Sequence, residues 1–117
     1  MAAIVETSER ATLELLQTHY YKTSYEKLKE SYLDILRKLN ARIISIDDTY
    51  LEIFAETPHM AIQAKIIEQT PVETSIDFYI SSEFLFGSKK KAYQFIQTVY
   101  DALGKTYELK GLALHIK

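Results

Sequence analysis

Three consecutive segments between Arg42 and Ser82 alternate apolar and polar residues, and this pattern constrains the fold more than any other feature of the chain. The segments cover residues 49–56, 59–69 and 72–81. A period of two over such lengths is typical of β-strands that bury one face. The turn-forming pairs Thr57-Pro58 and Thr70-Pro71 separate the segments. Connections this short favour antiparallel neighbours, because a parallel pair needs a crossover of about a dozen residues or more.

A shorter strand at Arg42–Asp47 precedes these three, and an amphipathic helix flanks the group on each side. The helices are predicted over Ser24–Leu39 and Lys89–Leu103, each with an apolar stripe at helical spacing. An antiparallel sheet with both helices on one face buries one apolar sheet face and two apolar helix stripes together. The sequence therefore predicts an α+β fold in the order β-α-β-β-β-β-α, with a possible C-terminal strand.

The two ends of the chain are less clearly patterned. We expect residues 1–9 to form a loose arm. Residues 10–21 fit either a helix or a strand, and the aromatic and β-branched residues at 18–23 favour the strand. Residues 105–117 are expected to form a tail or an edge strand, because Leu112, Leu114 and Ile116 alternate with other residues. A length of 117 residues suits one domain, so we assign residues 1–117 to a single α+β domain.

The composition disfavours several classes of protein. The chain has no cysteine, which excludes disulfides and thiolate metal sites and fits a cytoplasmic protein. Its net charge is -2, from 14 basic and 16 acidic residues, which disfavours duplex nucleic acid as a partner. No apolar run approaches the roughly 20 residues that span a bilayer, and residues 1–6 lack the features of a signal peptide. We therefore expect no membrane partner.

No residue pattern indicates catalysis or a cofactor. His19, His59 and His115 lie on different predicted elements without an i, i+4 partner, and a metal site would need them to converge with Asp47 or Asp48. Adjacent acids between two strands are more typical of a turn than of an acid–base pair. Neither a G-x-S-x-G motif nor a glycine-rich phosphate loop occurs. We therefore predict a protein that is not an enzyme and has no metal or cofactor.

The segments Thr74–Ile80 and Phe86–Leu103 carry a resemblance to a known layout. An amphipathic strand leads through Gly87 into a final helix, and this resembles the strand-to-helix corner of small uncharacterised bacterial domains with helix-grip or TATA-binding-protein-like layouts. The resemblance covers residues 10–103 and rests on apolar positions and one glycine. Helix-grip relatives bind apolar ligands between the sheet and the long helix, so the resemblance implies a ligand there.

Three binding hypotheses remain open. The leading one is a binding or self-association module, a possible homo-oligomer, that uses the sheet face away from the helices. Tyrosine suits such surfaces because it joins a large apolar ring to a polar tip, and the chain has nine. If the strand register holds, this face carries Tyr50, Phe54, Lys65 and Tyr79. The second hypothesis is a carrier of a small apolar ligand between sheet and helices, near Tyr25, Tyr32, Phe78 and Phe95.

The third hypothesis is an anion or nucleic-acid site at the start of the second predicted helix. Lys89, Lys90 and Lys91 stand there beside aromatic residues, and helix N-termini attract anions. The alternative is that the three lysines are only the solvated start of an amphipathic helix. The near-neutral charge of the whole chain makes nucleic acid an unlikely partner.

Overall fold

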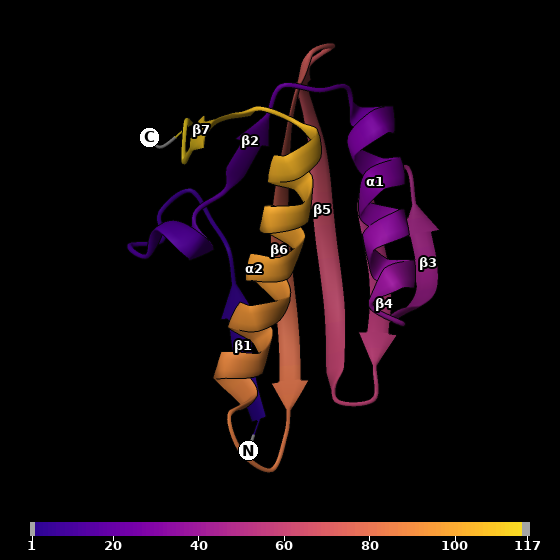
Figure 1. Cartoon of the computed structure of the whole chain (residues 1–117), viewed down its shortest axis with the longest axis vertical. Coiled ribbons are helices and arrows are strands. Elements are labelled where there is room, and N and C mark those ends of the chain that lie inside the picture. The colour runs from indigo at the N-terminus through magenta and orange to yellow at the C-terminus, as the bar shows by residue number, and fades with distance from the viewer. Residues whose placement is uncertain (1, 116–117) are drawn as a thin grey trace.

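The computed structural model describes residues 2–115, and within them two helices pack on one face of a seven-stranded antiparallel sheet (Figure 1). The helices are α1 (Tyr25–Lys38) and α2 (Ser88–Thr106). The strands are β1 (Ala2–Glu6), β2 (His19–Tyr21), β3 (Arg42–Asp47), β4 (Glu52–Thr57), β5 (Met60–Thr70), β6 (Glu73–Glu83) and β7 (Leu109–Leu112). The predicted α+β class is confirmed, with both helices on the same side of the sheet. No helix in the described part of the chain is long and apolar enough to cross a membrane.

Strands β3, β4, β5 and β6 lie side by side in chain order, so the predicted meander is confirmed. β5 and β6 form the long central pair, with Ile62 opposite Ile80 and Ala64 opposite Phe78. The sheet then continues from β6 to β2 and β7, while β1 also pairs with β6. The two ends of the chain therefore both add strands on the side of the sheet away from β3.

The core lies between the sheet and the two helices, and the Phe78 ring is at its centre. The ring centroid of Phe78 is 5.8 Å from that of Tyr32 on α1, and 5.9 Å and 5.6 Å from those of Phe95 and Tyr100 on α2. Phe78 is 2% exposed and Tyr32 is fully buried. The apolar stripes of both helices thus meet one face of the sheet, as the periodicity of the sequence predicts.

The N-terminal predictions need correction. A loose arm at residues 1–9 is wrong for Ala2–Glu6, because these residues form β1 and pair with β6 from Glu83 to Tyr79. Val5 reaches the core and is 4% exposed, which gives this strand an apolar anchor. The strand at residues 10–21 is confirmed only for His19–Tyr21. The residues before it leave the sheet, and a short 3₁₀ helix at Glu14–Leu16 packs partly against the core.

The ends of the elements also differ in detail from the predictions. α2 runs three residues beyond the predicted end at Leu103, and Gly104 lies inside it. Gly87 has a φ of 71°, so the left-handed backbone at the corner before α2 is one that glycine adopts without strain. The predicted edge strand in the tail is confirmed in part as β7, which pairs with β2, but Leu114 lies in a turn, so of the described alternating residues only Leu112 belongs to the strand. Ile116, which the pattern also places there, lies outside the described residues.

The hydroxyl of Tyr32 offers a test of the core. It is buried and has no hydrogen-bond partner among residues 2–115. A buried hydroxyl that has lost water without gaining a partner is destabilising. We expect Tyr32→Phe to raise the free energy of unfolding by about 1 kcal/mol, measured by urea denaturation.

The matched control is Tyr21→Phe. The Tyr21 hydroxyl is also in the core, but it donates a hydrogen bond to the Tyr100 carbonyl at 3.4 Å. Its removal should leave stability unchanged or lower it. A clear loss of stability in Tyr32→Phe would contradict the prediction.

Candidate functional site

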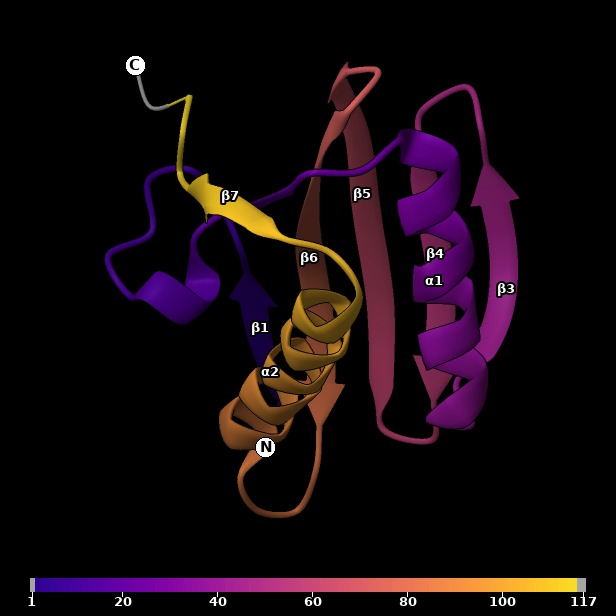
Figure 2. The ribbon, with the colours of Figure 1, turned by 45° about the horizontal axis from the view of Figure 1, so that its top comes forward.

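The sheet face opposite the helices is not covered by either of them (Figures 1 and 2). We call it the open face. Alternate residues of β6 point to it, since Ile76, Phe78 and Ile80 between them point to the core. The β6 residues on the open face include Glu73, Ser75, Asp77, Tyr79 and Ser81. The register aligns them with neighbouring strands in two rows, which are Glu52–Lys65–Asp77 and Phe54–Gln63–Tyr79.

β1 and β2 pair one after the other with the same edge of β6. Glu6 lies opposite Tyr79, whereas His19 lies opposite Ile76, so the chain leaves the sheet between them and then returns. Residues 8–18 form this excursion. Backbone hydrogen bonds close it, from Ser8 N to the Leu16 carbonyl at 2.9 Å and from Thr18 N to the Ser8 carbonyl at 3.2 Å.

Asp77 lies where β6 faces the two ends of the excursion. The Thr7 hydroxyl donates to its Oδ1 at 2.6 Å, and the Thr18 hydroxyl lies 2.8 Å from Oδ1 and 3.0 Å from Oδ2. Both threonines are buried. Burial is the main cause that raises the pKa of Asp77; the two hydroxyls oppose it, and the carboxylates of Glu9 and Glu6 add to it. Asp77 therefore holds both ends of the excursion against the sheet.

A hollow of about 420 Å³ opens beside this carboxyl group, and we call it the Asp77 hollow. It is lined by Glu6, Thr7, Ser8, Glu9, Thr18, Gln63, Lys65, Asp77, Phe78 and Tyr79. One carboxylate oxygen of Glu9 accepts a hydrogen bond from the Tyr20 hydroxyl. The other, Oε2, is buried and has no hydrogen-bond partner in the described part of the chain. Among the described lining residues, three carry carboxyl groups and one, Lys65, carries a positive charge.

A second hollow of about 320 Å³ adjoins the first on the open face, and we call it the apolar groove. Ile44, Phe54 and Tyr79 are among its lining residues, and Tyr79 and Gln63 line both hollows. Ile44 is brought to this face by an irregularity in the pairing of β3 with β4, which lies between Ile43 and Ser45.

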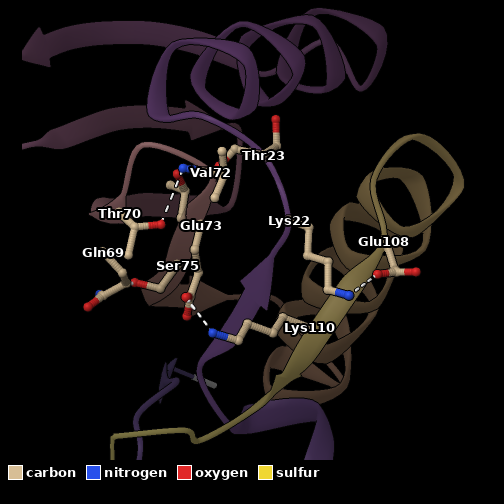
Figure 3. A network of polar contacts seen from close by, with 10 residues as sticks. Lys22, Thr23, Gln69, Thr70, Val72, Glu73, Ser75, Glu108 and Lys110 are labelled. Atoms are coloured by element: carbon tan, nitrogen blue, oxygen red, sulfur yellow. Dashed lines mark hydrogen bonds and ion pairs between the residues drawn. The ribbon is translucent and has the colours of Figure 1, made fainter.

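A polar network lies at the far end of β6 (Figure 3). Glu73 is 7% exposed and accepts a hydrogen bond from Lys110 Nζ on β7 at 2.5 Å. Lys22, which directly follows β2, forms an ion pair with Glu108 just before β7. Each lysine in Figure 3 thus has a carboxylate partner. The network joins the chain around β2, β6 and β7, and we assign it a structural role.

The residues predicted for the open face are partly brought together. Phe54, Lys65 and Tyr79 lie on neighbouring strands of this face and line the two hollows. Tyr50 is 67% exposed, but it lies in the turn before β4 and outside the lining of either hollow as described.

The residues predicted around an apolar ligand lie between the sheet and the helices. The Phe78 ring contacts those of Tyr32 and Phe95 there, and Tyr25 packs at the edge of the core, partly buried. Lys89, Lys90 and Lys91 are exposed at the start of α2. The Lys89 ammonium lies 5.6 Å from the centroid of the Tyr93 ring.

The histidines are dispersed, and each lies against an aromatic ring. His19 stacks on Tyr100 with centroids 3.4 Å apart, His59 lies beside Phe84, and His115 beside Tyr20. Within residues 2–115, no group of three or more histidine, aspartate or glutamate side chains is arranged to hold a metal ion.

The two adjacent acids have separate structural partners. Asp47 Oδ1 accepts hydrogen bonds from the backbone N–H groups of Thr49 and Tyr50, and Asp48 pairs with Lys29 at 2.7 Å. The interpretation of Asp47-Asp48 as a turn therefore agrees with its geometry.

Thr7, Thr18 and Glu9 were missed by the sequence reasoning. The two threonines contact Asp77 from about 60 to 70 residues away in the chain, and no local sequence pattern indicates such a contact. Comparison of the chain with protein-family models and with curated proteins finds no match.

Proposed function

We propose that the protein is a non-enzymatic binding module that holds, in the Asp77 hollow, an organic group with a positive charge, such as an ammonium or guanidinium. The observation that carries this proposal is the Glu9 Oε2 atom, a buried acceptor without a protein donor among residues 2–115. Because Oε2 is shielded from solvent, the Glu9 side chain would have to turn toward the hollow before a ligand N–H group could donate to it.

The charges around the hollow support the same ligand class. Its lining includes three acidic residues, Glu6, Glu9 and Asp77. Lys65, the cation in the lining, lies opposite Asp77 on the neighbouring strand. The raised pKa of Asp77 means that burial destabilises its negative form more than the two threonine hydroxyls stabilise it. A cation beside it would stabilise that form and lower the pKa of Asp77 again. Hydrogen bonds to a charged group are also stronger than those between neutral groups.

The apolar groove supports a ligand that also has an apolar part. The Tyr79 side chain is 43% exposed and lines both hollows, so one ligand can reach its ring and the carboxylates together. Aromatic rings also attract cations through their faces. An aromatic or aliphatic amine, or a basic side chain of a peptide beside an apolar one, meets both requirements.

The threonines beside Asp77 support binding rather than catalysis. Their hydroxyls are buried, and that of Thr7 also accepts a hydrogen bond from Phe78 N at 2.8 Å. They are therefore occupied with holding the fold. A ligand between sheet and helices, as the helix-grip resemblance implies, would have to displace the contacting rings of Tyr32, Phe78 and Phe95. For this reason we place the ligand on the open face.

Benzylamine, which is positively charged at neutral pH, is a suitable probe, and neutral benzyl alcohol is its match in shape. We expect benzylamine to shift the amide NMR signals of Thr7, Asp77 and Tyr79, and benzyl alcohol to shift them much less. Glu9→Gln should raise the Kd for benzylamine about tenfold, because it removes one charged acceptor.

The control variant is Asp34→Asn, which removes an exposed carboxylate on α1 that pairs with Arg37. It should leave the Kd unchanged. Equal responses to the amine and the alcohol would overturn the proposed charge recognition. Shifts confined to Lys89–Lys91 or to the core residues around Phe78 would overturn the proposed location.

A further inference from the structure

β3 and β7, the two ends of the main path of paired strands, differ in how far they are protected against pairing with another strand; β1, which pairs only with β6, leaves a further free edge. β7 at one edge has four residues and includes Lys110 and Gly111. β3 at the other edge has six, Arg-Ile-Ile-Ser-Ile-Asp, with neither lysine nor proline. Proteins commonly use short strands, lysine and proline to keep an exposed edge from pairing. β3 carries two other protective features, the charged residues Arg42 and Asp47 at its ends and the irregular pairing between Ile43 and Ser45.

The β3 sequence is complementary to itself in the antiparallel direction. When a second β3 is laid against it about a two-fold axis between Ile44 and Ser45, Arg42 of each copy lies opposite Asp47 of the other. Ile43 then lies opposite Ile46, and this contact also occurs twice. Opposite charges and β-branched pairs directly across two strands both stabilise an antiparallel pair.

The faces on which these side chains lie agree with that register. Arg42 lies opposite Glu56 in β4, and Asp47 opposite Glu52, which places both on the open face. Ile43 lies opposite Ala55 and Ile46 opposite Ile53, and both of these partners are buried on the helix side. Each predicted contact between the copies therefore joins side chains on the same face of the sheet.

Apolar side chains stay exposed along this edge on the helix side. Ile46 is 42% exposed, although its cross-strand neighbour Ile53 is 2% exposed. α1 lies beside β3 in both views of the ribbon (Figures 1 and 2), and Leu39 at its end is 38% exposed. Pairing of two β3 strands would cover Ile46 with Ile43 of the second copy.

We propose that the protein forms a homodimer through antiparallel pairing of β3 with β3 of a second copy. The two-fold axis is perpendicular to the sheet, so the two sheets join into one with the helices of both copies on the same side. The contacts are carried by the two ends of the strand, because the irregularity at Ile44 interrupts its middle. Both Asp77 hollows then open on the same face, but dimerisation does not depend on what they bind.

Sedimentation analysis over protein concentrations up to about 1 mM tests the dimer. We expect the natural sequence to dimerise and Ile46→Lys to weaken the dimer at least about tenfold, because a lysine would then lie opposite Ile43 of the second copy. The matched control is Leu109→Lys on the opposite edge strand, where the replaced side chain is 44% exposed. It should dimerise like the natural sequence.

Hydrogen exchange gives a second measurement that needs no variant. Amides in Arg42–Asp47 should gain protection as the protein concentration rises, whereas those in Leu109–Leu112 should not. A protein that stays monomeric at the highest concentration would overturn the proposal. Equal weakening by the two lysine variants, or concentration-dependent protection at β7 in place of β3, would do the same.

Discussion

Replacement of Phe78 by alanine is expected to lower the free energy of unfolding by about 3–5 kcal/mol, the range measured for truncation of buried phenylalanines. The effect combines the lost burial of the ring with the cavity that it leaves. Phe78 is 2% exposed, and its ring contacts the rings of Tyr32, Phe95 and Tyr100. The large neighbouring rings come from two different helices, α1 and α2, so they are poorly able to close the cavity together.

Urea denaturation followed by circular dichroism measures this loss. Domains of ordinary size are stable by about 5–15 kcal/mol, so the variant should keep little reserve of stability. Phe86→Ala is the matched control, because Phe86 is 82% exposed in the turn before α2. Its stability should change by less than about 0.5 kcal/mol. Similar losses in the two variants would mean that Phe78 is not at the centre of the core.

The contrast between these two phenylalanines shows how far a periodic sequence predicts a fold. Phe78 lies in an alternating segment, and its burial follows from its position two residues from Ile76 and Ile80. The same alternation predicts the strands β3 to β6 and the face of most residues in β4 to β6, whereas in β3 the irregularity between Ile43 and Ser45 breaks it. Phe86 lies in a connector without an alternating or helical pattern. Its apolar character alone therefore does not predict whether it is buried or exposed.

β1 was missed for a related reason. Five residues of alternating burial are too few to distinguish a strand from an arm, and the edge of β6 that stabilises them is about 75 residues away in the chain. Pairing with that edge decides their structure, rather than any propensity of their own. β1 and β2 pair one after the other with the same edge of β6. The excursion at residues 8–18 separates them in the sequence, so this shared pairing cannot be recognised from the sequence.

In the candidate site, too, the residues of the alternating strands were predicted and those outside them were not. Lys65, Phe54 and Tyr79 were predicted to share a face because alternation fixes which side of a strand a residue occupies. The hydroxyl groups that hold Asp77 come from outside the meander. A threonine in a loop looks the same in sequence whether it is solvated or donates to a buried carboxylate. The chemistry of the hollow therefore appears only once the chain is folded.

Two ionisable groups in this fold respond to pH in opposite directions. The raised pKa of Asp77 means that the folded state binds a proton on this carboxyl group more tightly than the unfolded state does. Asp77 therefore lowers stability as the pH rises from its unfolded-state pKa through its folded-state pKa. Burial lowers the pKa of His19 from 6.5 to about 4, and the hydrogen bond to the Gln17 carbonyl only partly opposes it. His19 therefore raises stability as pH rises, and variants are needed to separate the two effects.

Acidification from pH 7 to pH 4 is expected to remove up to about 3 kcal/mol of stability through His19 alone. The unfolded state takes up a proton on this side chain below about pH 6.5, whereas the folded state does so only near pH 4. The ring is held neutral because it is 8% exposed and stacks on Tyr100, with its Nδ1 2.7 Å from the Gln17 carbonyl. A charged imidazolium would lose most of its solvation in that position.

Urea denaturation of the natural sequence and of His19→Gln at several pH values between 4 and 7 measures this contribution. The variant is expected to lose less stability on acidification than the natural sequence, by up to about 3 kcal/mol, whatever its stability at pH 7. His59→Gln is the control for the replacement of a histidine elsewhere in the chain, in the turn before β5. Parallel stability curves for His19→Gln and the natural sequence would show that the folded state protonates His19 as readily as the unfolded state does.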